Sequence, residues 1–119
     1  MVYFYSALDK RLNKFRIGYL HVVGSAQDGP QNNESDRALL RSLRELWKGF
    51  YVVNGGYDGP RGKEAVLAGY ADAVAYGRAF LANPDLPRRL HLGAPLNEPD
   101  QQTFYGGDAR GYTDYPSLS

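Results

Sequence analysis

The sequence has 119 residues, 43% hydrophobic and 23% charged, which is typical of one small globular domain. Its formal net charge of +1 argues against a nucleic-acid or membrane partner, and no apolar run approaches the roughly 20 residues that span a bilayer. Because there is no cysteine and the N-terminus lacks the pattern of a secretory signal, we expect a cytoplasmic protein without disulfides or thiolate chemistry.

The first part of the chain predicts two helices separated by a strand. In residues 2–15, apolar side chains recur at spacings of three and four, as on one face of an amphipathic helix. Residues 17–23 are rich in β-prone side chains, and residues 24–35 hold the glycine, proline and amide side chains of a loop. A second helix follows and ends at Gly49. Its buried stripe consists of Leu39, Leu40, Leu43, Leu46 and Trp47.

Two more strands are predicted farther along the chain, with helical segments after each of them. The strands cover residues 50–54 and 71–76, and a helix over residues 61–68 joins them. Residues 77–82 form a short helical turn directly after the third strand. A last helix over residues 84–92 has a proline in its first turn, a position that suits proline.

The end of the chain and the order of the elements together predict the architecture. Asn83 is the predicted N-cap of the last helix, and the tail, residues 94–119, is rich in turns. Helices that alternate with strands predict an α/β fold whose sheet is parallel. Three strands are too few to close a barrel, so both edges of the sheet would stay open. We expect residues 1–119 to form a single incomplete domain.

Glycines mark the ends of the second and third predicted strands. Gly55 and Gly56 follow one strand, and Gly77 and Arg78 follow the other. The carboxyl ends of neighbouring parallel strands meet at one edge of a sheet, where backbone N–H groups and an arginine suit a phosphate. We interpret these residues as a phosphate site. The alternative for Arg78 is an exposed arginine on a short helix.

The titratable residues outside these loops favour structural roles. His21 lies between apolar residues of the first predicted strand, and we expect a packed structural histidine there. Asp72 lies at the start of the third predicted strand and is expected to cap or form an ion pair rather than catalyse. No metal site is predicted, because the two histidines are far apart in the sequence and cysteine is absent.

Several sequence blocks, in order and at matching spacing, carry a family resemblance. The blocks are residues 54–58, 76–86, 93–97, 103–105 and 111–116. Together they resemble the carboxyl-terminal part of the Old Yellow Enzyme family, the FMN-dependent ene-reductases that include the 12-oxophytodienoate reductases. The resemblance covers nearly the whole chain and implies the last three βα units of a TIM (β/α)8 barrel. In that fold a phosphate often lies beside the loops after strands seven and eight.

The resemblance also implies roles for individual residues. The positions that hold the FMN phosphate in the family correspond to Gly55, Gly56, Gly77 and Arg78. Phe104 matches a position that lies against the flavin, and Tyr105 matches one that borders the substrate pocket. Without the resemblance, these two aromatic residues would be interpreted as plugs over the mouth of the barrel.

The family passes a hydride from NAD(P)H through FMN to the activated C=C bond of an enone-type substrate. Its substrate-binding pair, His/Asn or His/His, and its proton-donating tyrosine lie on earlier strands, so the resemblance implies no catalytic residue in this sequence. Residues 24–27 also depart from the Glu-Pro-Arg pattern that the family shows after the first strand. We therefore expect a truncated oxidoreductase, with weak or no FMN binding and no alkene reduction by the chain alone.

A second hypothesis belongs to a different functional class. The open edges of the sheet could pair with another copy of the chain or with a complementary barrel fragment. The protein would then be a non-catalytic half-barrel that serves as an interaction or FMN-binding module.

Overall fold

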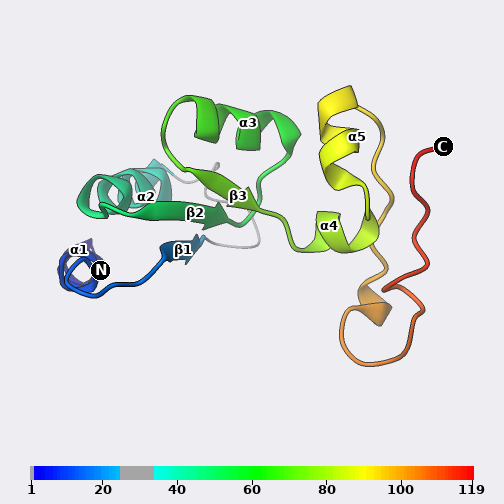
Figure 1. Cartoon of the computed structure of the whole chain (residues 1–119), viewed down its shortest axis with the longest axis horizontal. Helices are drawn as coiled ribbons and strands as arrows, with labels where there is room; N and C mark the ends of the chain where they lie inside the picture. Colours follow the sequence, from blue (N-terminus) through cyan, green and yellow to red (C-terminus); the bar gives the residue numbers. More distant parts are fainter. Residues whose placement is uncertain (1, 25–33) are drawn as a thin grey trace. The chain divides into compact units, whose positions relative to one another are not determined.

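The computed structural model describes residues 2–24 and 34–119, which form two compact units (Figure 1). One unit extends to Ala75, and the other begins at Tyr76. The elements of the first unit are α1 (Val2–Leu12), β1 (Tyr19–Val23), α2 (Glu34–Leu46), β2 (Phe50–Asn54), α3 (Gly59–Leu67) and β3 (Ala73–Ala75). Those of the second are α4 (Arg78–Ala82), α5 (Leu86–Leu92) and the 3₁₀ turn η1 (Gln101–Thr103).

The three strands form a parallel sheet in the order β1-β2-β3, as the alternation of elements predicts. Tyr19 is paired with Phe50, and Val52 is paired with Ala73. Each connection between neighbouring strands contains a helix, which parallel pairing requires because the chain must return to the starting edge of the sheet. The predicted α/β class is therefore confirmed.

The hydrophobic core lies between one face of the sheet and the helices. Tyr51 and Val53 of β2 are buried there against Leu43 of α2 and the neighbouring Trp47. The polar atoms of the two large aromatic side chains are satisfied. The Trp47 indole donates to the Phe50 carbonyl at 2.9 Å, and the Tyr51 hydroxyl donates to the Leu40 carbonyl at 3.2 Å. These two aromatic side chains therefore avoid the cost of burying an unpaired polar atom.

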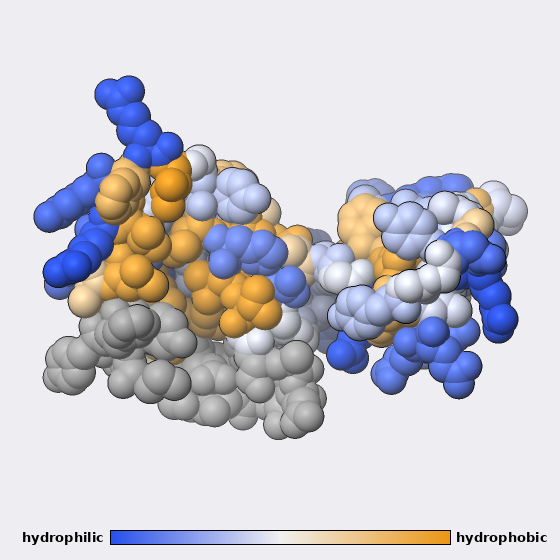
Figure 2. Space-filling model, turned by 90° about the horizontal axis from the view of Figure 1, so that it is seen from below, coloured by the Kyte–Doolittle hydropathy of each residue, from blue (hydrophilic) through white to orange (hydrophobic). Residues whose placement is uncertain are grey.

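The opposite face of the sheet is exposed. Side chains alternate along a strand, so Tyr19, His21 and Val23 share the face that the helices do not cover. Tyr19 and Val23 are 60% and 66% exposed. Figure 2 shows apolar residues gathered on one face of the first unit. The expectation that His21 is packed was wrong, because its position in the strand directs it to the uncovered face.

Several boundaries in the first unit differ from the sequence prediction. Helix α1 ends at Leu12 and β1 begins at Tyr19, whereas a helix over residues 2–15 and a strand over residues 17–23 were predicted. Contacts explain two further differences. The third strand is Ala73–Ala75 rather than residues 71–76, because Ala71 and Asp72 are used in other contacts. The Ala71 N–H donates to the Ala65 carbonyl, which closes the end of α3. Helix α3 begins at Gly59 because the Asp58 side chain accepts from the Arg61 N–H at 2.8 Å.

In the second unit, the start of α5 was predicted wrongly. Its N-cap is Asp85, and Asn83 is instead the C-cap of α4. The Asn83 side chain is fully buried and donates to the Ala79 carbonyl at 2.8 Å. The end of α5 agrees with the prediction, since Gly93 has the left-handed conformation that favours glycine. No helix in the described part of the chain is long and apolar enough to cross a membrane.

Candidate functional site

The loop after β2 needs glycine for two separate reasons. Gly55 and Gly56 have φ values of 108° and 70°, which residues with side chains rarely adopt. In addition, a Cβ at Gly55 would lie 3.1 Å from the Gly24 carbonyl oxygen. The Gly24 N–H donates to the Asn54 carbonyl at 2.9 Å, which continues the pairing of β1 with β2 past the strand ends. Gly24 and Gly55, the first residues after these two strands, therefore meet through bare backbone at the carboxyl edge of the sheet.

Gly77 is in a different situation. Its φ is −84°, and no described atom lies within 4 Å of the position that a Cβ would take. Neither backbone conformation nor packing therefore requires glycine at this position, in contrast to Gly55. The Gly77 carbonyl accepts from the Leu81 N–H at 2.9 Å and begins the hydrogen bonding of α4.

Three of the predicted site residues lie together in the second unit. The Arg78 guanidinium carbon is 6.0 Å from the centre of the Phe104 ring, the outer limit of a cation–π contact. Phe104 in turn meets Tyr105 edge to face, with ring centres 6.5 Å apart. Tyr105 is 94% exposed, whereas Phe104 is half-buried. The arrangement places a fixed cation beside an aromatic ring, with a second aromatic ring at the surface.

The chemistry of these groups fits a phosphorylated aromatic cofactor. An arginine forms paired, charge-assisted hydrogen bonds with phosphate, and it stays protonated at any physiological pH. Glycine backbone such as that at Gly55 lets a ligand approach main-chain N–H groups closely. An aromatic ring such as Phe104 can lie against a planar ring system. The residues present therefore suit the FMN that the sequence resemblance implies.

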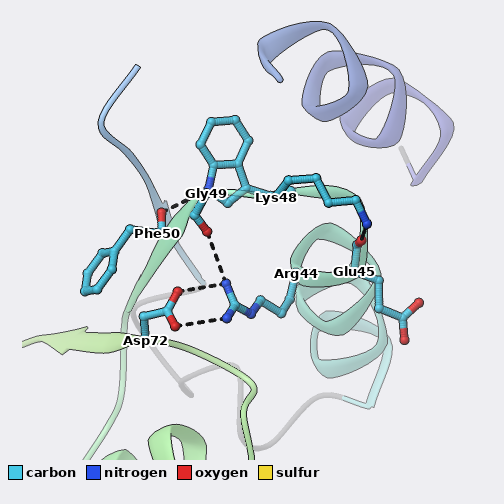
Figure 3. A pocket seen from close by; sticks show the side chains of 7 residues that line it. Arg44, Glu45, Lys48, Gly49, Phe50 and Asp72 are labelled. Atoms are coloured by element: carbon cyan, nitrogen blue, oxygen red, sulfur yellow. Dashed lines mark hydrogen bonds and ion pairs between the residues drawn. The ribbon is translucent and has the colours of Figure 1, made fainter. Parts of the chain in front are cut away.

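A cavity of about 570 Å³ opens at the other end of β2, where sequence analysis expected no ligand (Figure 3). Its centre is an ion pair in which the Arg44 guanidinium donates twice to the Asp72 carboxylate, at 2.8 and 3.0 Å. The Tyr51 N–H donates to the same carboxylate at 2.8 Å. This backbone N–H, together with Arg44, holds the pKa of Asp72 below its usual range.

The cavity is best explained as a structural part of the fold. It lies beside Phe50, the first residue of β2, and barrels carry their ligands at the carboxyl ends of the strands. The expectation that Asp72 caps or pairs is confirmed, whereas Arg44, its partner, was missed. The only sequence signal was an arginine in the last turn of a helix. Among the described residues, no group of three or more acidic or histidine side chains is placed to hold a metal ion.

Comparisons with known proteins agree with the sequence resemblance. The family model described as NADH:flavin oxidoreductase / NADH oxidase matches residues 1–97. The chain is 53% identical over 100 residues to putative 12-oxophytodienoate reductase 12 of Oryza sativa subsp. japonica, covering 82% of this chain and 25% of that protein. It is 46% identical over 108 residues to 12-oxophytodienoate reductase 2 of Arabidopsis thaliana, covering 90% of this chain and 29% of that protein.

A solved structure of morphinone reductase in complex with tetrahydroNAD is also similar, with a TM-score of 0.82 and 42% identity. That match covers 99% of this chain and 31% of the morphinone reductase chain. The chain therefore spans about a quarter to a third of the length of these relatives. Its three strands correspond to part of their TIM barrel, which confirms the predicted partial-barrel fold.

Proposed function

Since the chain belongs to the NADH:flavin oxidoreductase / NADH oxidase family, the Old Yellow Enzyme family, we propose that it provides the FMN-phosphate part of an ene-reductase site. FMN, when bound, supplies hydride transfer from NAD(P)H to the activated C=C bond of an enone-type substrate. The residues of this chain have the task of holding and orienting that cofactor. We propose that activity needs groups beyond those present here, so the chain alone does not reduce alkenes.

The contact between Arg78 and Phe104 carries this proposal. It joins a permanent cation, suited to phosphate, to an aromatic ring, suited to the flavin, within one compact unit. Among the described residues, no carboxylate pairs with Arg78, so its charge is not neutralised by another side chain there. On the sequence resemblance, and not on the placement of the two units, the proposed phosphate ligands are Arg78 and the backbone N–H groups of Gly55, Gly56 and Gly77. Tyr105 is proposed to border the substrate.

The test compares FMN with riboflavin, which has the same ring system but no phosphate. Phosphorus-31 NMR can follow weak FMN binding to the 119-residue chain, and fluorescence quenching follows both ligands. Arg78→Gln should weaken FMN binding by roughly ten- to hundredfold, the effect of one charge-assisted contact, and leave riboflavin unchanged. Arg110→Gln, an exposed arginine of the tail, is the matched control and should change neither. Equal FMN affinities in the two variants would refute the proposed role of Arg78.

The exposed face of the sheet favours a second candidate function. Tyr19, Val23 and Phe50 are each at least half exposed, although in a closed barrel such a face is covered. The chain would then act as a half-barrel that associates with another copy or with a complementary fragment through this face and the open strand edges. Light scattering after size-exclusion chromatography tests self-association. A monomer at all concentrations, with no affinity for a complementary barrel fragment, would eliminate this candidate.

A further inference from the structure

Arg89 is a buried arginine that holds two distant parts of the tail. Only 4% of the residue is exposed, and its Nε donates to the Asp85 carboxylate at 2.8 Å. Its remaining nitrogens donate to the Pro95 carbonyl at 2.6 Å and to the Pro116 carbonyl at 2.8 Å. One guanidinium on α5 therefore binds both ends of the segment 95–116. The Asp85 carboxylate is held in turn by the Leu118 N–H and by Arg89, and both lower its pKa.

Two asparagines also help to hold the ends of the segment 95–116 together. The Asn97 side chain donates to the Pro116 carbonyl at 2.8 Å and to the Ala82 carbonyl at 2.9 Å. The Asn97 N–H donates to the buried Asn83 side chain at 2.7 Å. The Pro116 carbonyl thus accepts from both Arg89 and Asn97. The ends of the segment are joined to each other and to the end of α4.

Further contacts join residues within the segment 95–116, immediately next to Phe104. Gly111 lies so close to Thr103 that an added Cβ would collide with the Thr103 side chain. The Gly111 N–H also donates to the Asp114 carboxylate at 2.7 Å. The Asp100 N–H donates to the Tyr115 hydroxyl at 2.9 Å. Phe104 follows Thr103 directly in the sequence. Its backbone is therefore anchored next to the contact between Thr103 and Gly111.

We propose that Arg89 is a positioning residue, which holds the segment 95–116 so that Phe104 lies against Arg78. The inference rests on the proposed flavin role of Phe104 and Arg78, neither of which Arg89 contacts. The forked guanidinium makes this role specific to arginine. The three nitrogens of the planar guanidinium donate to three separate acceptors, which the single ammonium of a lysine cannot reproduce.

The test uses Arg89→Lys in the full 119-residue chain, with Arg88→Lys as the matched control. Arg88 is the neighbouring arginine on the same helix, but it is exposed and donates to the carbonyls of Leu118 and Ser119, at 3.3 and 3.4 Å. In Arg89→Lys, amide hydrogen exchange over residues 97–113 should accelerate by about ten- to hundredfold, because the segment opens without unfolding α5. The NMR signal of the Arg78 Nε–H should shift towards its random-coil position. Arg88→Lys should leave both unchanged.

These two measurements need no flavin, so they separate this inference from the proposed function. If exchange and the Arg78 signal are the same in Arg89→Lys and the control, the positioning role is wrong even if FMN binds. If both change but the FMN affinity of a flavin-binding chain stays the same, the placement of Phe104 does not matter for the cofactor, and the inference also fails. Faster exchange, a shifted Arg78 signal and FMN binding weakened by about tenfold or more, with riboflavin weakened too, support it.

A second variant protects the test against misfolding of Arg89→Lys, which would show as loss of exchange protection in α5 itself. Asn97→Ala removes the other donor to the Pro116 carbonyl and leaves the ion pair between Arg89 and Asp85 in place. The same acceleration over residues 97–113, smaller in size, is expected. If Asn97→Ala leaves exchange unchanged in a folded chain, closure of the segment does not depend on this network, and the inference is overturned.

Discussion

Asp72 joins three elements of the first unit, and replacing it separates two contributions to stability. Its carboxylate accepts two hydrogen bonds from Arg44, at the end of α2, and one from the N–H of Tyr51 in β2. Asp72→Asn keeps an oxygen that can accept from Tyr51 but removes the charge. Asp72→Ala removes both acceptors. The difference between the two variants therefore isolates the hydrogen bond to the Tyr51 N–H.

The structure allows the size of each contribution to be worked out. The side chains of the ion pair are 25% and 32% exposed, so solvent screening limits the pair to about 0.5–1 kcal/mol. Tyr51 has no exposed surface, and leaving its N–H unpaired costs about 1–3 kcal/mol. Asp72→Asn should therefore lower the free energy of unfolding by about 1 kcal/mol. Asp72→Ala should lower it by about 1.5–4 kcal/mol, the sum of the two contributions.

The assay is urea unfolding followed by fluorescence. The chain has one tryptophan, Trp47, which is 4% exposed in the core beside Tyr51 and reports on the first unit. Glu45→Gln, an exposed acidic residue at the same end of α2, is the control and should change stability by less than about 0.5 kcal/mol. If Asp72→Asn is as damaging as Asp72→Ala, the hydrogen bond to the Tyr51 N–H contributes nothing and the reasoning is wrong.

Three further outcomes are expected for the first unit, each measured by Trp47 fluorescence during urea unfolding. Gly55→Ala should lower the free energy of unfolding by about 1–3 kcal/mol, because the backbone conformation of Gly55 and its contact with Gly24 both oppose a Cβ. Gly69→Ala should lower it less, because the space around Gly69 is open. Equal losses in the two variants would refute the packing contribution. Asp9 is 2% exposed, its Oδ2 has no partner among the described residues, and burial raises its pKa. Asp9→Leu should therefore stabilise the chain at pH 7 by about 1–3 kcal/mol, and this gain should shrink as the pH falls through the raised pKa of Asp9, where the wild-type carboxyl becomes neutral. The pKa of Asp72 is lowered, so its contribution is complete above about pH 3.9 and is lost as the pH falls through its lower folded value. Asp72→Asn should flatten this acid loss, and an unchanged pH profile would contradict the assignment.

Local patterns in the sequence determined the class of fold and one end of the candidate site. Helical and strand periodicities alternate, and such alternation has few solutions other than a parallel sheet with helical connections. Gly55 and Gly56 were predicted to end a strand in a glycine loop, and their positive φ angles explain why glycine is needed there. The prediction that Arg78, Phe104 and Tyr105 belong to one site came from the resemblance, because residues so far apart in the sequence carry no local signal of contact.

Only the tertiary structure decided which polar side chains meet across long stretches of sequence. Arg44 and Asp72 lie 28 residues apart, and Arg89 reaches carbonyls on both sides of a long loop. Asn83 looked like an N-cap because a proline follows it, but burial against the tail directs its side chain elsewhere. The side of the sheet that His21 occupies likewise depends on which face the helices cover. Periodicity and capping signals act over a few residues, whereas these partners are chosen by packing of the whole unit.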